Sequence, residues 1–137
     1  MDSDLPSRLI REHRELDELF GRFLAASSAG DTEEARDAIR TFDEALRRHT
    51  AFEEENVIPA PEGRRLVPSE VDDAARTLHR ELRLEHVQVR EVSAMILRLL
   101  EEKNDLEGAR RLAPNLGRRW DAHTTREERD LFRGSSS

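Results

Sequence analysis

The fold is decided by residues 35–53, which read ARDAIRTFDEALRRHTAFE. Apolar or ligand-type residues recur here at steps of three and four, the spacing of one face of an α-helix. This face consists of Ala35, Ile39, Phe42, Leu46, His49 and Glu53. A helix with such a face packs it inward against other helices, so the stretch predicts one helix of a bundle.

Three other stretches carry the same periodicity. Their faces consist of Leu9, His13, Leu16, Phe20 and Phe23; of Ala75, His79, Leu82, His86, Val89, Ser93, Ile96 and Leu100; and of Ala109, Ala113, Leu116, Trp120, His123, Glu127 and Leu131. Turn signals separate the stretches at Ala29-Gly30-Asp31, from Pro59 to Pro68, and at Asn104-Asp105. Because short connections make neighbouring helices antiparallel, the sequence predicts an all-α fold, an up-down-up-down four-helix bundle.

Several local features of this bundle can be predicted as well. We expect one domain over residues 1–137, with its core at 5–132 and a frayed tail at 133–137. Asp31 with Glu34 is typical of a capping box, and Ser69 is a candidate N-cap for the third helix. Pro114 falls inside the fourth stretch, where it predicts a kink or a local break.

Composition excludes several classes of function. The net charge is −7, and acidic and basic residues interleave along the chain, which argues against a nucleic-acid partner. The chain has no cysteine, so disulfides, Fe–S clusters and thiolate zinc sites are excluded. No apolar run approaches the ~18 residues of a membrane span, and the acidic N-terminus lacks the features of a signal peptide. We therefore expect no membrane association and a cytoplasmic location.

All five histidines lie on the predicted inward faces, where a bundle helix ordinarily carries leucine or isoleucine. His13 and His49 lie 17 and 19 residues from the glycine of the first short turn. His86 and His123 lie 19 and 18 residues from the aspartate of the second. Equal distances from a turn mean equal heights in an antiparallel pair, so these four histidines are expected at one level. Buried imidazoles need partners, and a metal ion would provide one for all of them.

The two halves of the chain also repeat the same motifs at a shift of 73 or 74 residues. Glu12-His13 matches Glu85-His86, and the run from His49 to Glu54 matches the run from His123 to Glu128. The repeat predicts two helical hairpins in a pseudo-twofold relation, which would bring matching side chains to one axis. In each half the histidine and the glutamate of an H-x-x-x-E motif rise on one helix face in successive turns.

This arrangement predicts a site for two metal ions. The candidate ligands are His13, His49, Glu53, His86, His123 and Glu127. A carboxylate can bridge two cations, while each histidine binds one. An oxo or hydroxo bridge would add a further donor to each ion and still leave an open position for a small ligand. Mixed nitrogen and oxygen donors suit iron or manganese better than calcium, and zinc is also compatible.

These motifs resemble those of the hemerythrin-like, or HHE cation-binding, family. The matching segments are Glu12 to Leu16, His49 to Glu55, Glu85-His86 and His123 to Glu128, and the resemblance extends from about Leu5 to Phe132. It implies a four-helix bundle with a non-haem di-iron centre, held by the same six residues. Members of the family carry or sense oxygen, store or scavenge iron, or handle peroxide and nitric oxide.

The chain departs from the family pattern in two respects. Oxygen carriers of the family place a second histidine one turn before the position of His86, where this chain has Leu82. His79 lies two turns before His86, ~10.5 Å along the helix, and is a further candidate for the second metal or for a proton-carrying role. Some members use the carboxylate one residue later, so Glu54 and Glu128 are alternatives to the glutamates that precede them.

Several functions follow from these expectations. The first is reaction with a small oxidant, O2, H2O2 or NO, with a catalase-like or peroxide-reducing activity if the protein is an enzyme. The alternatives are a non-catalytic metal store or sensor, and a metal-free helical interaction module. Trp120, one turn before His123, is interpreted either as a wall of a ligand pocket or as core packing.

Overall fold

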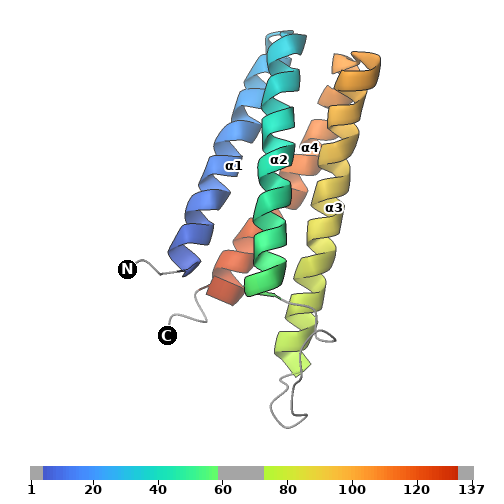
Figure 1. Cartoon of the computed structure of the whole chain (residues 1–137). Helices are drawn as coiled ribbons and strands as arrows, with labels where there is room; N and C mark the ends of the chain where they lie inside the picture. Colours follow the sequence, from blue (N-terminus) through green and yellow to red (C-terminus); the bar gives the residue numbers. More distant parts are fainter. Residues whose placement is uncertain (1–4, 59–72, 133–137) are drawn as a thin grey trace.

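Four antiparallel helices make up most of the part of the chain that the computed structural model describes, residues 5–58 and 73–132 (Figure 1). They are α1 (Leu5–Ser28), α2 (Thr32–Asn56), α3 (Asp73–Lys103) and α4 (Leu106–Arg126), and α4 runs on into the short π-helix η3 (Glu127–Phe132). The chain runs up and down in turn, and the most extensive packing joins α1 to α2 and α3 to α4. The predicted all-α four-helix bundle is confirmed.

Both short turns end one helix and begin the next with a polar cap. Gly30 has a positive φ of 75°, a conformation that glycine adopts without strain. Asp31 then accepts a hydrogen bond from the Glu34 backbone nitrogen at 3.1 Å, as the predicted capping box requires. The Glu34 side chain pairs with Arg22 instead of closing the box. Asp105 caps α4 in the same way, since its side chain accepts from Gly108 N at 2.8 Å.

Other predicted features fall outside the described residues. These are the candidate cap Ser69, the longer connection around it and the tail at 133–137.

The fourth helix has no break at Pro114. The expected local break is wrong, because α4 continues through this residue from Leu106 to Arg126. Pro114 is exposed, so the Arg110 carbonyl that loses its backbone partner lies on the solvent side, where water can satisfy it. The helix changes instead at Glu127, where η3 widens the turn, a feature that often marks functional sites.

The interior consists of two apolar regions separated by a polar layer. The main core fills the half of the bundle near the short turns, with Phe23, Phe42 and Leu116 fully buried. The polar layer holds the histidines and glutamates of the predicted site. Beyond it, Leu9, Leu82 and Ile58 are also fully buried, one turn further from the short turns. The polar layer is therefore closed off from water by apolar side chains on both sides.

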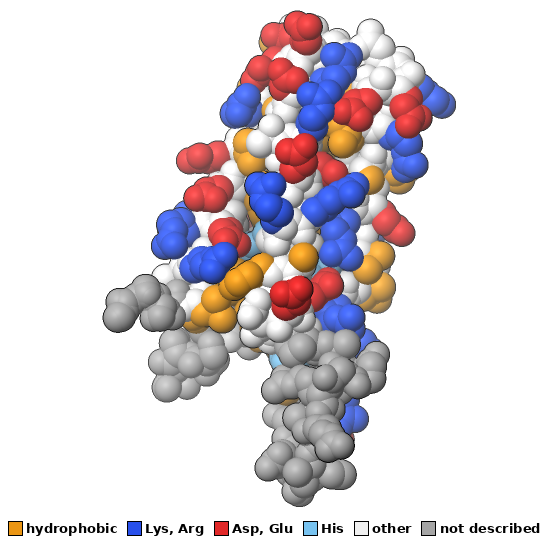
Figure 2. All heavy atoms as spheres, viewed as in Figure 1, with side chains coloured by type: hydrophobic (Ala, Val, Ile, Leu, Met, Phe, Trp, Pro, Cys, Tyr) orange, Lys and Arg blue, Asp and Glu red, His pale blue; other side chains and the backbone are white. Residues whose placement is uncertain are grey.

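The outer surface carries closely mixed charges. Figure 2 shows arginines and acidic side chains interleaved over the visible face of the helices, as expected for solvated helix faces. None of the described helices combines the length and the apolar character needed to cross a membrane.

Candidate metal centre

Six candidate ligands converge from all four helices into one buried layer. The histidines come one from each helix, Glu53 comes from α2, and Glu127 is the first residue of η3. None of the six residues exposes more than 4% of its surface. The helical periodicity that faced each residue inward, and the near-equal distances from the turns, account for this convergence.

The six side chains form two groups that share both glutamates. The first group is His13, His49, Glu53 and Glu127, and the second is Glu53, His86, His123 and Glu127. In each group one ligand atom per residue lies within 4.8 Å of the others, a geometry that could hold a metal ion. Two adjacent groups with two shared carboxylates have the composition of a two-metal site.

The distances around the shared carboxylates follow the pseudo-twofold repeat. Within one helix, His49 Nε2 lies 3.2 Å from Glu53 and His123 Nε2 lies 3.1 Å from Glu127. Across the bundle, His13 Nε2 lies 3.0 Å from Glu127 and His86 Nε2 lies 2.9 Å from Glu53. The two halves of the chain therefore contribute matching contacts to one centre.

Several of these buried polar atoms lack a hydrogen bond in spite of their closeness. Among the described residues, no hydrogen-bond partner is oriented toward His49 Nε2, His123 Nε2, either oxygen of Glu53 or Glu127 Oε1. A buried polar atom left in this condition costs about 1–3 kcal/mol. A cation at each group would satisfy these atoms together, and nitrogen and carboxylate oxygen are ligands of iron, manganese and zinc. The residues therefore fit the metal centre that the sequence predicts.

Each of the four histidines also has a carboxylate on its outer side. We call this set the outer carboxylates: Glu12, Glu54, Glu85 and Glu128. Glu12 contacts His49 Nδ1 at 2.6 Å, and Glu85 contacts His123 Nδ1 at 2.7 Å. Because an ionised carboxylate only accepts hydrogen bonds, Nδ1 is the donor in these pairs, and Nε2 faces the interior.

The other two outer carboxylates follow the same rule. Glu54 contacts His86 Nδ1 at 2.9 Å, and Glu128 contacts His13 Nδ1 at 3.0 Å. Glu54 and Glu128 were the alternative ligands in the sequence. The structure places both on the outer side of a histidine, and the two groups contain the glutamates that precede them.

Arginines support three of the outer carboxylates, but from different positions. Arg8 lies 3.1 Å from Glu12 and stacks over the ring of Phe52 at 4.0 Å. Arg126, which matches Phe52 in the repeat, lies 2.8 Å from Glu85. The third pair is looser, since Arg90 lies 3.6 Å from Glu54. The repeat therefore conserves the carboxylate but not its arginine partner. Glu12 is paired with an arginine of its own helix, whereas Glu85 is paired with an arginine of α4.

The surrounding charges shift the pKa values of the buried groups. Burial lowers the pKa of His13, but its contacts with Glu127 and Glu53 outweigh burial and raise that pKa to about 10. Burial is likewise outweighed at His86, whose carboxylate neighbours raise its pKa to about 11. Burial raises the pKa of Glu127, yet the surrounding histidines hold it well below its ordinary value. Without metal, the imidazoles are thus the cations that compensate the carboxylates.

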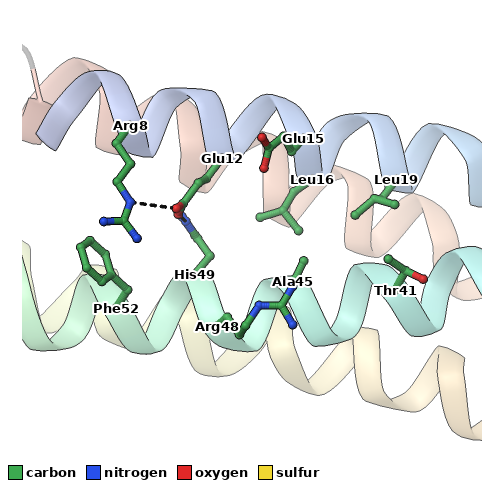
Figure 3. A pocket seen from close by; sticks show the side chains of 10 residues that line it. All are labelled: Arg8, Glu12, Glu15, Leu16, Leu19, Thr41, Ala45, Arg48, His49 and Phe52. Carbon is green, nitrogen blue, oxygen red and sulfur yellow. Dashed lines mark hydrogen bonds and ion pairs between the residues drawn. The ribbon is translucent and has the colours of Figure 1, made fainter. Parts of the chain in front are cut away.

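A groove between α1 and α2 leads from solvent to one of the histidine–carboxylate pairs (Figure 3). Its volume is about 330 Å³. Its lining residues are Arg8, Glu12, Glu15, Leu16, Leu19, Thr41, Ala45, Arg48, His49 and Phe52. Figure 3 shows Arg8 and Glu12, both from α1, paired with each other at the groove, with Glu12 directly beside His49 of α2. Glu12 is therefore in contact both with solvent and with a histidine of the buried layer.

Trp120 packs against the same layer from the side of the main core. Its ring centroid lies 5.5 Å from that of His13, 6.3 Å from that of His49 and 6.1 Å from that of His123. Its Nε1 donates a hydrogen bond to Asp17 Oδ1 at 2.7 Å. Trp120 thus belongs to the core, as one interpretation of the sequence has it, and its ring also contacts the histidine layer.

The remaining sequence candidate, His79, belongs to neither of the two groups found among the described residues. Its side chain is half-buried. Leu82, which replaces the extra histidine of the oxygen carriers, is fully buried in the apolar layer. The sequence also contained a signal for residues whose role was missed. The sequence shows Glu12-His13 and Glu85-His86 as a repeat. It does not show that Glu12 and Glu85 bind histidines of a neighbouring helix, His49 and His123.

Fold and site together define a four-helix-bundle protein whose buried histidine and glutamate cluster is suited to bind metal ions. Comparison with protein families gives a match over residues 4–134 to the model described as "Hemerythrin HHE cation binding domain". The chain belongs to this family. Comparisons with curated proteins and with solved structures give no significant match.

Proposed function

We propose that the two groups of buried side chains hold two iron ions joined by an oxo or hydroxo bridge, and that the protein reacts with a small oxidant, O2, H2O2 or NO. The observation that carries this proposal is the convergence of six buried nitrogen and oxygen side chains, several without hydrogen bonds, around two adjacent positions. Membership of a cation-binding family supports the same proposal. Manganese and zinc are compatible with the same donors.

The chain's own residues would prepare this chemistry. Bound iron would supply the electrons and the open coordination position that a small oxidant needs. The fully buried Leu9, Leu82 and Ile58 exclude water from one side of the layer. Glu12 is open to the groove and hydrogen-bonded to His49, so it is placed to exchange protons with solvent. If the protein is an enzyme, catalase-like disproportionation of H2O2 is the first activity to assay.

The direct test is metal content together with an optical spectrum. Protein loaded with Fe(II) in air is expected to hold about two iron ions per chain and to absorb visible light, with a spectral change on adding H2O2. His49→Ala removes a donor from the first group only, so it should lose about one ion and most of this change. His79→Ala is the matched control and should retain both. A colourless iron-loaded wild type that does not respond to peroxide would contradict the proposal.

Trp120 provides a second, independent readout of the metal. It is the only tryptophan and the chain has no tyrosine, so the ultraviolet-excited emission comes almost entirely from this residue. Its ring lies within 6.3 Å of three histidines of the layer, so iron bound there should quench most of the emission. Zinc has a filled d shell and should leave the emission largely intact. Equal emission with iron and without metal would place the iron elsewhere.

A further inference from the structure

The outer carboxylates link the four helices in a closed ring. Glu12 of α1 binds a histidine of α2, and Glu54 of α2 binds one of α3. Glu85 of α3 binds a histidine of α4, and Glu128, just after α4, binds the histidine of α1. The first three links each cross from one helix to the next in chain order. The last one closes the ring between α1 and η3, on the side where α1 and α4 pack less extensively than the other helices that are neighbours in the ring.

The last link of the ring comes from the π-helix η3, which contains both Glu127 and Glu128. Glu127 and Glu128 are neighbours, yet Glu127 is fully buried at the centre and Glu128 reaches the outer side of His13. Glu53 and Glu54 divide their roles in the same way on α2. Both halves of the chain thus use adjacent glutamates for different purposes. The first lies among the Nε2 atoms and the second holds an Nδ1 atom.

Such a ring has two physical consequences for a bound ion. A hydrogen bond at Nδ1 fixes the ring orientation and leaves the Nε2 lone pair directed at the centre. Each carboxylate also adds a negative charge near the ions. Because Coulomb energy scales with the product of the charges, a trivalent ion gains more from it than a divalent ion does.

We propose that the outer carboxylates are positioning residues that hold the histidine ligands in register and favour the higher oxidation state of the bound ions. This inference rests on the proposed metal centre. It concerns what the chain does to the ions beyond ligating them. The positioning residues are Glu12, Glu54, Glu85 and Glu128.

Two substitutions at each position separate orientation from charge. Glu→Gln keeps an oxygen that can accept the Nδ1 hydrogen bond but removes the charge, whereas Glu→Ala removes both. Glu55→Gln is the matched control, because Glu55 is an exposed carboxylate next to Glu54. Because the ring has four members, a variant that fails to fold by circular dichroism is replaced by the same change at another member.

Two measurements on the full-length protein give the readout. Zinc affinity, from competition with a chromophoric chelator, should fall about 10- to 100-fold in the alanine variants and much less in the glutamine variants. The reduction potential of the iron-loaded protein should rise in the glutamine variants. We expect the ferric form to lose about tenfold more affinity than the ferrous form, a shift of about 59 mV for a one-electron couple. The control should change neither quantity.

The results distinguish a failure of the role proposed for the outer carboxylates from a failure of the proposed metal centre. If the wild type binds two ions but the glutamine variants keep the potential of the control, the ring has no electrostatic role and the inference is overturned, while the proposed function stands. Equal zinc affinity in the alanine variants and the control would remove the positioning role in the same way. If the wild type binds no stoichiometric metal, the inference and the proposed function both fail.

As a further check of sign, Arg126→Met removes the cation 2.8 Å from Glu85 and should shift the potential in the opposite direction, downward. An upward shift in this variant would contradict the electrostatic role.

Discussion

Replacement of Glu53 by glutamine is expected to abolish binding of both metal ions. Glu53 belongs to both groups of candidate ligands, and its oxygens lie within 3.7 Å of His13, His49 and His86. An amide is a poor ligand for iron and cannot bridge two cations as a carboxylate does. His123→Ala, in contrast, alters only the second group and should leave about one ion per chain. Elemental analysis of the wild type, Glu53→Gln and His123→Ala proteins after identical iron loading measures this difference.

The same substitution should also destabilise the metal-free protein. Removing one partner of a buried ion pair costs about 3–5 kcal/mol, because it leaves the remaining charges uncompensated. Chemical unfolding in the presence of a chelator gives this value, with Glu55→Gln as the control for loss of an exposed carboxylate. Two tightly bound ions in a folded Glu53→Gln protein would show that the shared glutamate is not a ligand.

Metal loading at pH 7 is expected to release about two or more protons per chain. The pKa of His13 is raised to about 10 and that of His86 to about 11, so both imidazoles are protonated at neutral pH without metal. A metal ion takes the Nε2 lone pair and must displace the proton. Titration of the weakly buffered apoprotein with zinc, followed by a pH indicator, counts these protons. Affinity should rise about tenfold per pH unit for each proton released. Zinc binding without proton release would mean that these histidines are neutral in the apoprotein.

Whereas metal affinity should rise with pH, the free energy of unfolding of the metal-free protein should fall at alkaline pH. For the two histidines with raised pKa, the stabilisation is complete below about pH 6.5 and is lost as pH rises through about 10 and 11. The pKa values of Glu53 and Glu127 are lowered, so their stabilisation is present above about pH 4.5 and is lost in stronger acid. The gap in melting temperature between zinc-loaded and metal-free protein should therefore widen between pH 6 and pH 9. A gap that narrows over this range would contradict the assigned charges.

The helix faces could be predicted from the sequence because they depend on a local period. Each residue's direction around its own helix follows from its position along the chain, so the inward placement of Phe42 and His86 required no knowledge of the neighbours. The turns were equally local, since Gly30 and Asp105 mark the helix ends by their own conformation and capping. The local break expected at Pro114 was wrong for a related reason. The cost of a proline depends on whether the deprived carbonyl faces core or solvent, and tertiary packing decides that.

The outer carboxylates could not be assigned in this way. Glu12 precedes His13 in the chain, but successive residues of a helix point about 100° apart, so it cannot serve that histidine. It contacts His49 instead, a pairing that depends on how closely α1 and α2 approach and how they are rotated. The choice of Glu127 over Glu128 as a ligand, in contrast, followed from the helical period, which places Glu127 on the inward face. The contact of Glu128 with His13 on another helix was not predictable in this way.

By itself, then, the sequence determined four amphipathic helices, their antiparallel order and a level at which histidines and glutamates replace apolar residues. These properties follow from spacing along one chain and from distance to a turn. Only the tertiary structure decided that the six residues form two groups with shared glutamates, and that a second set of glutamates holds the histidines from outside. Distances between atoms on different helices depend on interhelical packing and rotation, and a one-dimensional period carries no information about either.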